Sequence, residues 1–230
     1  MERSIHIAGV IDLAEAQLLI DCGIRHLGFP LVLDHHKEDL TIDAAASIVS
    51  KLGNHATFFA ITYLNKAQAI RELCDALSVD MVPLHGRTDL EQIQLLRKEA
   101  PRLRIIKSLI VRGGNAGALI DEVQRYGPSV DAFITDTFDP TTGASGATGR
   151  VHDWDISRRL VEVSNTPVIL AGGLTAKNVR RAIHAVRPAG VDVHTGIEGR
   201  DGRKRHDLTK RFVQEAQAGF SEIKFVSDAR

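Results

Sequence analysis

The chain has 230 residues, of which 43% are hydrophobic, and its 29 lysines and arginines balance its 29 aspartates and glutamates. That length suits a single domain and is close to the roughly 250 residues of an eight-unit α/β barrel. Balanced charge gives no long-range attraction to nucleic acid or to an anionic membrane, so neither is expected as a partner. No apolar run is long enough for a signal peptide or a membrane span, so a cytoplasmic protein is expected.

Eight short runs of strand-forming residues alternate with helical patterns along the chain. The segments between the runs carry apolar residues three and four positions apart, which is typical of amphipathic helices. Asp12 and Thr175 are among the expected helix caps, and Gly23 suits a helix end. The expected strands cover residues 4–10, 26–33, 57–64, 79–86, 103–111, 131–138, 167–173 and 191–198.

Strands that are apolar on both faces and separated by single helices predict a parallel sheet with its helices outside. A doubly wound open sheet is the rival fold, but the turn after the first strand lacks the G-x-G-x-x-G pattern of a dinucleotide site. Eight units favour closure into a single (β/α)₈ TIM barrel. We expect the barrel to span residues 1–218, with 219–230 as a C-terminal tail.

Barrel enzymes carry their chemistry where strands end and the following loops begin. Polar side chains at those positions are therefore the candidates for catalysis and substrate binding. They are Asp34, His35, His85, Lys107, Asp136, Asp192 and His194.

Glycines and hydroxyl residues follow the last three expected strands, and the last two match the usual phosphate site of such barrels. Glycine lets the backbone approach a ligand closely, and helix N-termini favour an anion. A phosphorylated small-molecule substrate is therefore expected. The predicted phosphate-binding residues are Gly146, Thr148, Gly149, Gly172, Gly173, Thr195 and Gly196.

The segment LAGGLTAKNVRRAIHAVRPAGVDVHTGIE, residues 170–198, resembles the last third of the phosphoribosylanthranilate isomerase family. The segments VDMVPLHG, IIKSLIV and DAFITDTF resemble its fourth, fifth and sixth strands, and GATGRVHDW its Gly-Gly-Thr-Gly loop followed by an aromatic residue, Asp and Trp. The resemblance extends from about residue 5 to residue 213.

The resemblance implies an Amadori rearrangement without metal or cofactor, in which an aminoaldose phosphate becomes an aminoketose phosphate in tryptophan biosynthesis. It implies that Asp136 is the general acid for ring opening and that Gly172, Gly173, Thr195 and Gly196 hold the phosphate. The Gly146–Gly149 loop would close over that phosphate, and Asp192 matches the aspartate of the eighth strand.

Four positions depart from the family pattern. Ala8 stands where the family has its general-base cysteine, and residues 32–41 replace the segment whose arginine meets the anthranilate carboxylate. Pro83 replaces a glutamine, and His194 a small residue. Since these changes affect the base and the aromatic end of the substrate, we expect an isomerase with an altered substrate.

Several groups are left as alternatives for the missing base. His35, His36, His85 and His194 have side chains that titrate in the required range. Lys107 could instead form a Schiff base in a lyase or aldolase, or pair with Asp136. A non-catalytic phosphosugar-binding protein is the third hypothesis.

Two remaining sequence patterns are not expected to bind a ligand. The DHHKED segment, 34–39, resembles a metal site only loosely, and no metal or cofactor is expected. The basic segment 199–207 is expected to be a solvated loop, and the protein to be a monomer or a homodimer.

Overall fold

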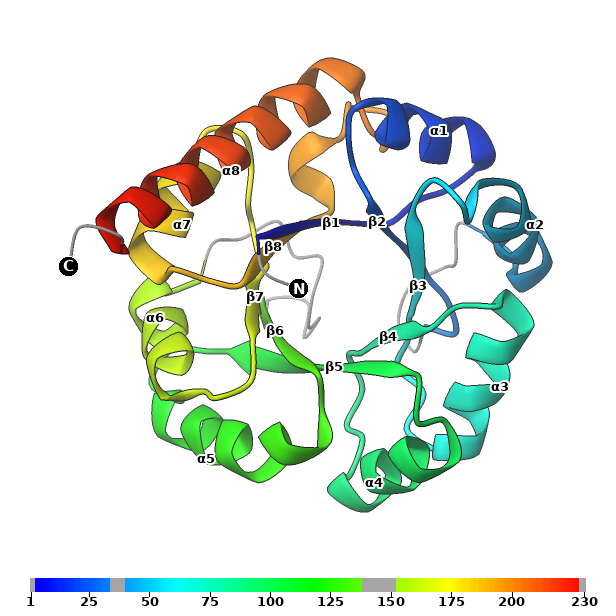
Figure 1. Cartoon of the computed structure of the whole chain (residues 1–230), viewed down its shortest axis with the longest axis horizontal. Helices are drawn as coiled ribbons and strands as arrows, with labels where there is room; N and C mark the ends of the chain where they lie inside the picture. Colours follow the sequence, from blue (N-terminus) through cyan, green and yellow to red (C-terminus); the bar gives the residue numbers. More distant parts are fainter. Residues whose placement is uncertain (1–2, 34–39, 138–151, 228–230) are drawn as a thin grey trace.

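A ring of eight parallel strands lies inside a ring of helices, so the predicted (β/α)₈ barrel is confirmed (Figure 1). The computed structural model describes residues 3–33, 40–137 and 152–227. The strand order β3-β2-β1-β8-β7-β6-β5-β4 is that of a barrel in which each strand neighbours the next in sequence. Between β3 and β4 the ring is bridged at Thr62 and Leu84, where the amide of His85 donates to the Thr62 carbonyl at 2.9 Å.

Each expected strand run overlaps an observed strand, and β8 begins one residue before the run expected for it. The strands are β1 Ser4–Ala8, β2 His26–Pro30, β3 Thr57–Ile61, β4 Met81–Leu84, β5 Arg104–Val111, β6 Ala132–Thr137, β7 Val168–Leu170 and β8 Gly190–Val193.

The helices lie between the strands, as the three- and four-residue spacing predicts. They are α1 Leu13–Asp21, α2 Ile42–Leu52, α3 Ala67–Leu77, α4 Leu90–Glu99, α5 Ala116–Tyr126, α6 Trp154–Val163, α7 Val179–Val186 and α8 His206–Ser227, with short 3₁₀ turns at Gly127–Ser129 (η1) and Thr195–Ile197 (η2).

Local sequence explains most helix boundaries. The Asp12 carboxylate accepts from the Glu15 amide at 2.8 Å and caps α1, as predicted. Gly23 follows α1 with φ of +90°, the conformation that a helix-ending glycine adopts most readily. The prediction of Thr175 as a cap was wrong, because α7 begins four residues later and Asn178 precedes it.

Side chains alternate between the barrel interior and the layer of helices. Residues such as Leu27, Leu109 and Phe133 join the large apolar core between strands and helices. A smaller interior cluster consists of Ala8, Phe59, Ile61, Met81, Ile106, Ala132, Ile134, Ile169 and Ala171. Because residues two apart on a strand share a face, this cluster identifies which strand-end side chains point into the barrel mouth.

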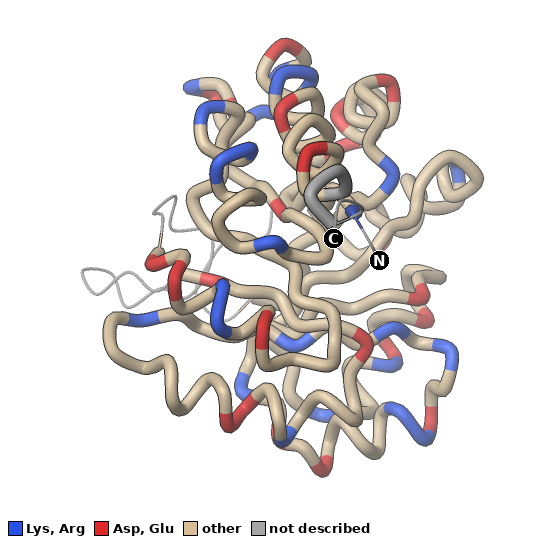
Figure 2. The backbone as a smooth tube through the Cα atoms, turned by 60° about the vertical axis from the view of Figure 1, so that its left-hand side comes forward, with Lys and Arg blue, Asp and Glu red and all other residues tan. Residues whose placement is uncertain are grey.

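The last helix is continuous across the expected boundary of the barrel. Gly219 lies inside α8, where an added Cβ would meet the Cα of Arg180 at 3.3 Å, and Phe220 is buried. The first residues of the expected tail are therefore part of the final barrel helix. Over the described residues, charges of both signs are interspersed on the outer helices (Figure 2), and none of these helices has the length and apolarity needed to cross a bilayer.

Candidate active site

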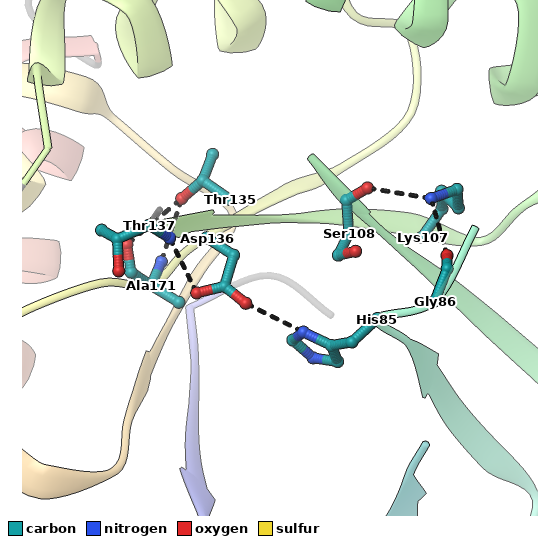
Figure 3. A network of polar contacts seen from close by, with 8 residues as sticks. All are labelled: His85, Gly86, Lys107, Ser108, Thr135, Asp136, Thr137 and Ala171. Atoms are coloured by element: carbon teal, nitrogen blue, oxygen red, sulfur yellow. Dashed lines mark hydrogen bonds and ion pairs between the residues drawn. The ribbon is translucent and has the colours of Figure 1, made fainter. Parts of the chain in front are cut away.

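A histidine–aspartate pair lies at the C-terminal ends of the strands. Nδ1 of His85, which follows β4, is 2.9 Å from Oδ2 of Asp136 on β6 (Figure 3). The other carboxylate oxygen of Asp136 accepts from the amide of Thr137 at 2.8 Å. The Asp136 side chain is 6% exposed and that of His85 14%. The Thr137 amide thus orients the Asp136 carboxylate, and the partly exposed His85 side chain leaves the pair open to the barrel mouth.

A second carboxyl group faces the same space from β8. The pKa of Asp192 is raised to about 7, chiefly by burial; the charge of Asp136 also raises it, whereas His85 and Lys204 lower it. The interaction with both members of the pair places Asp192 within their electrostatic reach. A carboxyl group with such a pKa exchanges protons near neutral pH, so Asp192 is able to take part in proton transfer beside the His85–Asp136 pair.

Lys107 lies on the other face of its strand. Its register partners Leu84 and Phe133 belong to the outer core, and its Nζ donates to the carbonyl of Ser108 at 3.2 Å, as Figure 3 shows. The ammonium also lies 5.9 Å from the ring centre of Tyr126 on α5. Burial lowers the pKa of Lys107, but this group contacts the helix layer, and the expected pairing with Asp136 is not formed.

The turns after β7 and β8 are packed against each other. A Cβ added to Gly196 would lie 1.8 Å from the carbonyl oxygen of Leu174, so only glycine permits this approach. Gly172 and Gly173 have φ of +99° and +63°, a region that glycine enters without strain. Thr195 begins η2 directly after β8, so these glycines and Thr195 lie where β7 and β8 end.

A side chain from α7 fixes the shape of the first of these turns. The Asn178 amide donates from Nδ2 to the Gly173 carbonyl at 2.9 Å and accepts at Oδ1 from the Thr175 amide at 2.8 Å. Asn178, the first residue of the Asn-Val helix start in the sequence, therefore holds this turn in one conformation.

The end of β1 carries no proton acceptor. Ala8 is 7% exposed and belongs to the interior cluster, which confirms that position 8 faces the barrel lumen. Gly9 follows with φ of +78°, and the ring of His194 occupies the space where a side chain of residue 9 would project. Nε2 of His194 is 3.4 Å from Oε1 of Glu198.

Sequence reasoning missed two contributors to the site. His152 precedes α6, where its Nε2 is 2.6 Å from the Ser157 hydroxyl, and burial lowers its pKa to about 4 although Asp136 acts to raise it. Its buried Nδ1 has no hydrogen-bond partner among the described residues and would be 2.9 Å from a Cβ at Gly172. The signal was present, because a histidine stands where the resembled pattern has an aromatic residue.

The second missed contributor is Lys204, which was expected to be solvated with the rest of its basic segment. Its side chain is fully buried and its Nζ is 2.6 Å from Oε1 of Glu198. Its amide donates to the buried carboxylate of Glu15 on α1 at 2.8 Å. Lys204 therefore anchors the loop after β8 to the start of α1.

Six candidate residues lie outside the described residues. They are Asp34, His35, His36, Gly146, Thr148 and Gly149.

Comparison with known proteins agrees with this geometry. The family model of N-(5′-phosphoribosyl)anthranilate isomerase matches residues 15–215. N-(5′-phosphoribosyl)anthranilate isomerase 2 of Methanosarcina mazei is 35% identical over 225 residues, covering 97% of this chain and 98% of that protein. The isomerase of Pelobacter propionicus is 32% identical over 95% of this chain and 97% of its own length.

Solved structures give the same result. The crystal structure of phosphoribosyl anthranilate isomerase from Thermotoga maritima is 27% identical and superposes with a TM-score of 0.78, covering 94% of this chain and 99% of its own. Another isomerase structure, in complex with reduced 1-(o-carboxyphenylamino)-1-deoxyribulose 5-phosphate, is 25% identical with a TM-score of 0.76 over the same shares.

Proposed function

This chain belongs to the N-(5′-phosphoribosyl)anthranilate isomerase family, and from that premise we propose that it isomerises a 5-phosphorylated ribosylamine whose amine substituent differs from anthranilate. The observation that carries the proposal is the His85–Asp136 pair beside the turns at Gly172–Gly173 and Gly196. It combines a proton donor with an anion-binding backbone at one barrel mouth.

Asp136 acts as the general acid in this proposal. Ring opening requires a proton on the ring oxygen as the carbon–oxygen bond breaks, and the nitrogen lone pair then forms an iminium ion. The His85–Asp136 pair holds a proton between its members, so Asp136 delivers it and His85 resupplies it. General acid catalysis of this kind contributes about 10²–10⁴-fold to rate.

The phosphate is held by the turns after β7 and β8. Backbone amides at positive-φ glycines and at the start of η2 supply donors without the entropy cost of long side chains. Asn178 keeps the first turn in one conformation, so its donors are in place before the substrate arrives. His152 adds a neutral imidazole beside Gly172.

The amine end of the substrate is where this chain differs from the family pattern. Pro83 is buried on the interior face of β4, where the pattern has a glutamine, and a proline offers no side-chain hydrogen bond. Near it the lumen is lined by the apolar interior cluster. Such a wall supports binding of an uncharged substituent over a carboxylated one, because an unpaired carboxylate is costly to desolvate.

The lyase hypothesis is less well supported, because the Lys107 ammonium donates to the backbone carbonyls of Ser108 and Gly86 and lies 5.9 Å from the ring centre of Tyr126.

Steady-state assays of the purified protein test the proposal, with N-(5′-phosphoribosyl)anthranilate and N-(5′-phosphoribosyl)aniline as paired substrates. The pair differs only in the carboxylate. We expect isomerisation of both, with kcat/KM for the aniline derivative at least equal to that for the anthranilate derivative. A preference for anthranilate above about tenfold, which is 1.4 kcal/mol, contradicts the altered substrate and leaves the isomerase intact. Absence of turnover with both substrates contradicts the proposed function itself.

A further inference from the structure

The isomerisation needs a proton acceptor opposite the general acid, and the end of β1 does not supply it. Ala8 presents only a methyl group, which is buried in the interior cluster with Ile134 and Ala171. The backbone turns away directly after it, at Gly9. The C2 proton therefore needs an acceptor from another element, and among the described residues β8 is paired directly with β1.

His194 enters this space from β8. Strands β1 and β8 are paired in parallel as far as Ile7 opposite Val193, and His194 follows directly after that pair. A Cβ built on Gly9 would lie 2.1 Å from Nε2 and 2.5 Å from Cδ2 of His194. The imidazole thus covers the end of β1, and glycine at position 9 is what makes room for it.

A carboxylate and an ammonium group lie behind His194. Oε1 of Glu198 is 3.4 Å from Nε2 of His194 and 2.6 Å from Nζ of Lys204. The ion pair with the buried Lys204 side chain holds the Glu198 carboxylate in one orientation. When the imidazole accepts a proton, the adjacent carboxylate stabilises the imidazolium, which is the role an acidic residue has beside a catalytic histidine.

The other two histidines at this end have different positions. His85 is bound to Asp136 and so belongs to the acid. His152 is bound to Ser157 and adjoins Gly172, on the phosphate side. His194 is thus the described histidine that lies at the end of β1.

We propose that His194 is the general base of this enzyme and takes over the function of the cysteine that the family pattern has at position 8. The inference rests on the proposed function. After ring opening, His194 accepts the proton from C2, the C–H electron pair forms a C1–C2 double bond, and the iminium π electrons return to nitrogen. The resulting enolamine becomes the ketose when C1 is protonated and the C2 hydroxyl loses its proton, so no external oxidant is required.

Substitution of His194, combined with restoration of cysteine at position 8, tests this assignment. We expect His194→Gln and His194→Asn to lower kcat by about 10²–10⁴-fold on the substrate that wild type turns over, the range for a lost base. Substrate deuterated at C2 should show a larger kinetic isotope effect in both variants than in wild type, because proton removal becomes slower than the other steps. His55→Gln, an exposed histidine far along the chain, is the matched control and should retain wild-type kcat.

The decisive variant is Ala8→Cys combined with His194→Gln. It places a thiol where the family pattern has one, and we expect it to recover at least tenfold of the lost kcat. If both single variants fold and have wild-type kcat and an unchanged isotope effect, His194 is not the base. The proposed function would still stand in that case, because the wild type turns the substrate over. Loss without recovery in the double variant would also overturn it in favour of a structural role. A wild type inactive on both test substrates would instead remove the proposed function on which the assignment rests.

Discussion

Histidines line the barrel interior at both ends of the strands, and their surroundings are opposite. In the N-terminal part, His6 stacks on His26 with ring centres 4.7 Å apart, and its Nε2 is 2.9 Å from the hydroxyl of Ser4. Burial lowers the pKa of His6 to about 3, with His26 and Arg104 adding to the effect. At the C-terminal end, His85 is bound to the carboxylate of Asp136.

The difference shows how one barrel separates stability from chemistry. A neutral, stacked histidine is a packing group, because its environment opposes the charged form. A histidine bound to a carboxylate shares a proton with it and is able to exchange that proton with a substrate. The residue type is the same, and its burial and the nearby charges decide which role it has.

The largest expected effect on turnover comes from removing the carboxylate at the C-terminal end. Asp136→Asn keeps the shape but removes the proton, so kcat should fall by at least ~10²-fold with the fold retained. Steady-state kinetics measures kcat, and circular dichroism shows whether the fold is retained. The control is Asp131→Asn just before β6, where the carboxylate accepts from the Ile105 amide at 2.7 Å and from Arg97. This control should lose stability and keep kcat; unchanged kcat in Asp136→Asn would remove the acid role.

The second effect concerns the phosphate turn beside the same end. Gly173→Asp introduces a negative charge into the predicted cradle, and two like charges about 4 Å apart cost about 4 kcal/mol at an effective dielectric of 20. Affinity for a phosphosugar, measured by calorimetry, should fall on the order of 10³-fold. Gly23→Asp is matched, since Gly23 also has positive φ and open space around it, but lies between α1 and β2. Equal affinities in the two variants would place the phosphate elsewhere.

The smallest effect tests the neutral histidine at the N-terminal end. The unfolded chain protonates His6 near pH 6.5, whereas the folded chain does so near pH 3, so between these values the unfolded state binds more protons. Stability attributable to His6 is therefore lost as the pH falls from about 6.5 towards 3, by up to about 1.4 kcal/mol per pH unit. In wild type, the free energy of unfolding measured with urea should be lower at pH 5 than at pH 7. In His6→Phe this decrease should be smaller by about 2 kcal/mol.

Ser4→Ala is the control for this measurement. It removes the hydrogen bond to Nε2 but leaves the titrating imidazole in place. Its pH dependence should match that of wild type even if its stability is lower. If His6→Phe and wild type lose stability equally between pH 7 and pH 5, the histidine at this end is not held neutral.

The sequence was sufficient for much of this molecule because its signals are local. Eight apolar runs separated by helical periods leave few alternatives to a closed parallel barrel, and the glycines of the LAGG and HTG turns mark places where the backbone must bend sharply. Strand-end positions also identified His85 and Asp136 as candidates at the barrel mouth, since all parallel strands end on the same side. The order of strands and helices along the chain was therefore enough to place these two residues at the barrel mouth.

Only the tertiary structure decided which face each strand residue takes and which distant residues meet. Strand β5 is buried on both faces, so its sequence has no polar alternation to reveal that Lys107 points outward. Likewise, no local pattern relates Gly9 to His194, because their contact arises only when β8 closes the barrel against β1. The register of that closure, fixed by packing around the whole ring, determines which imidazole lies beside Ala8.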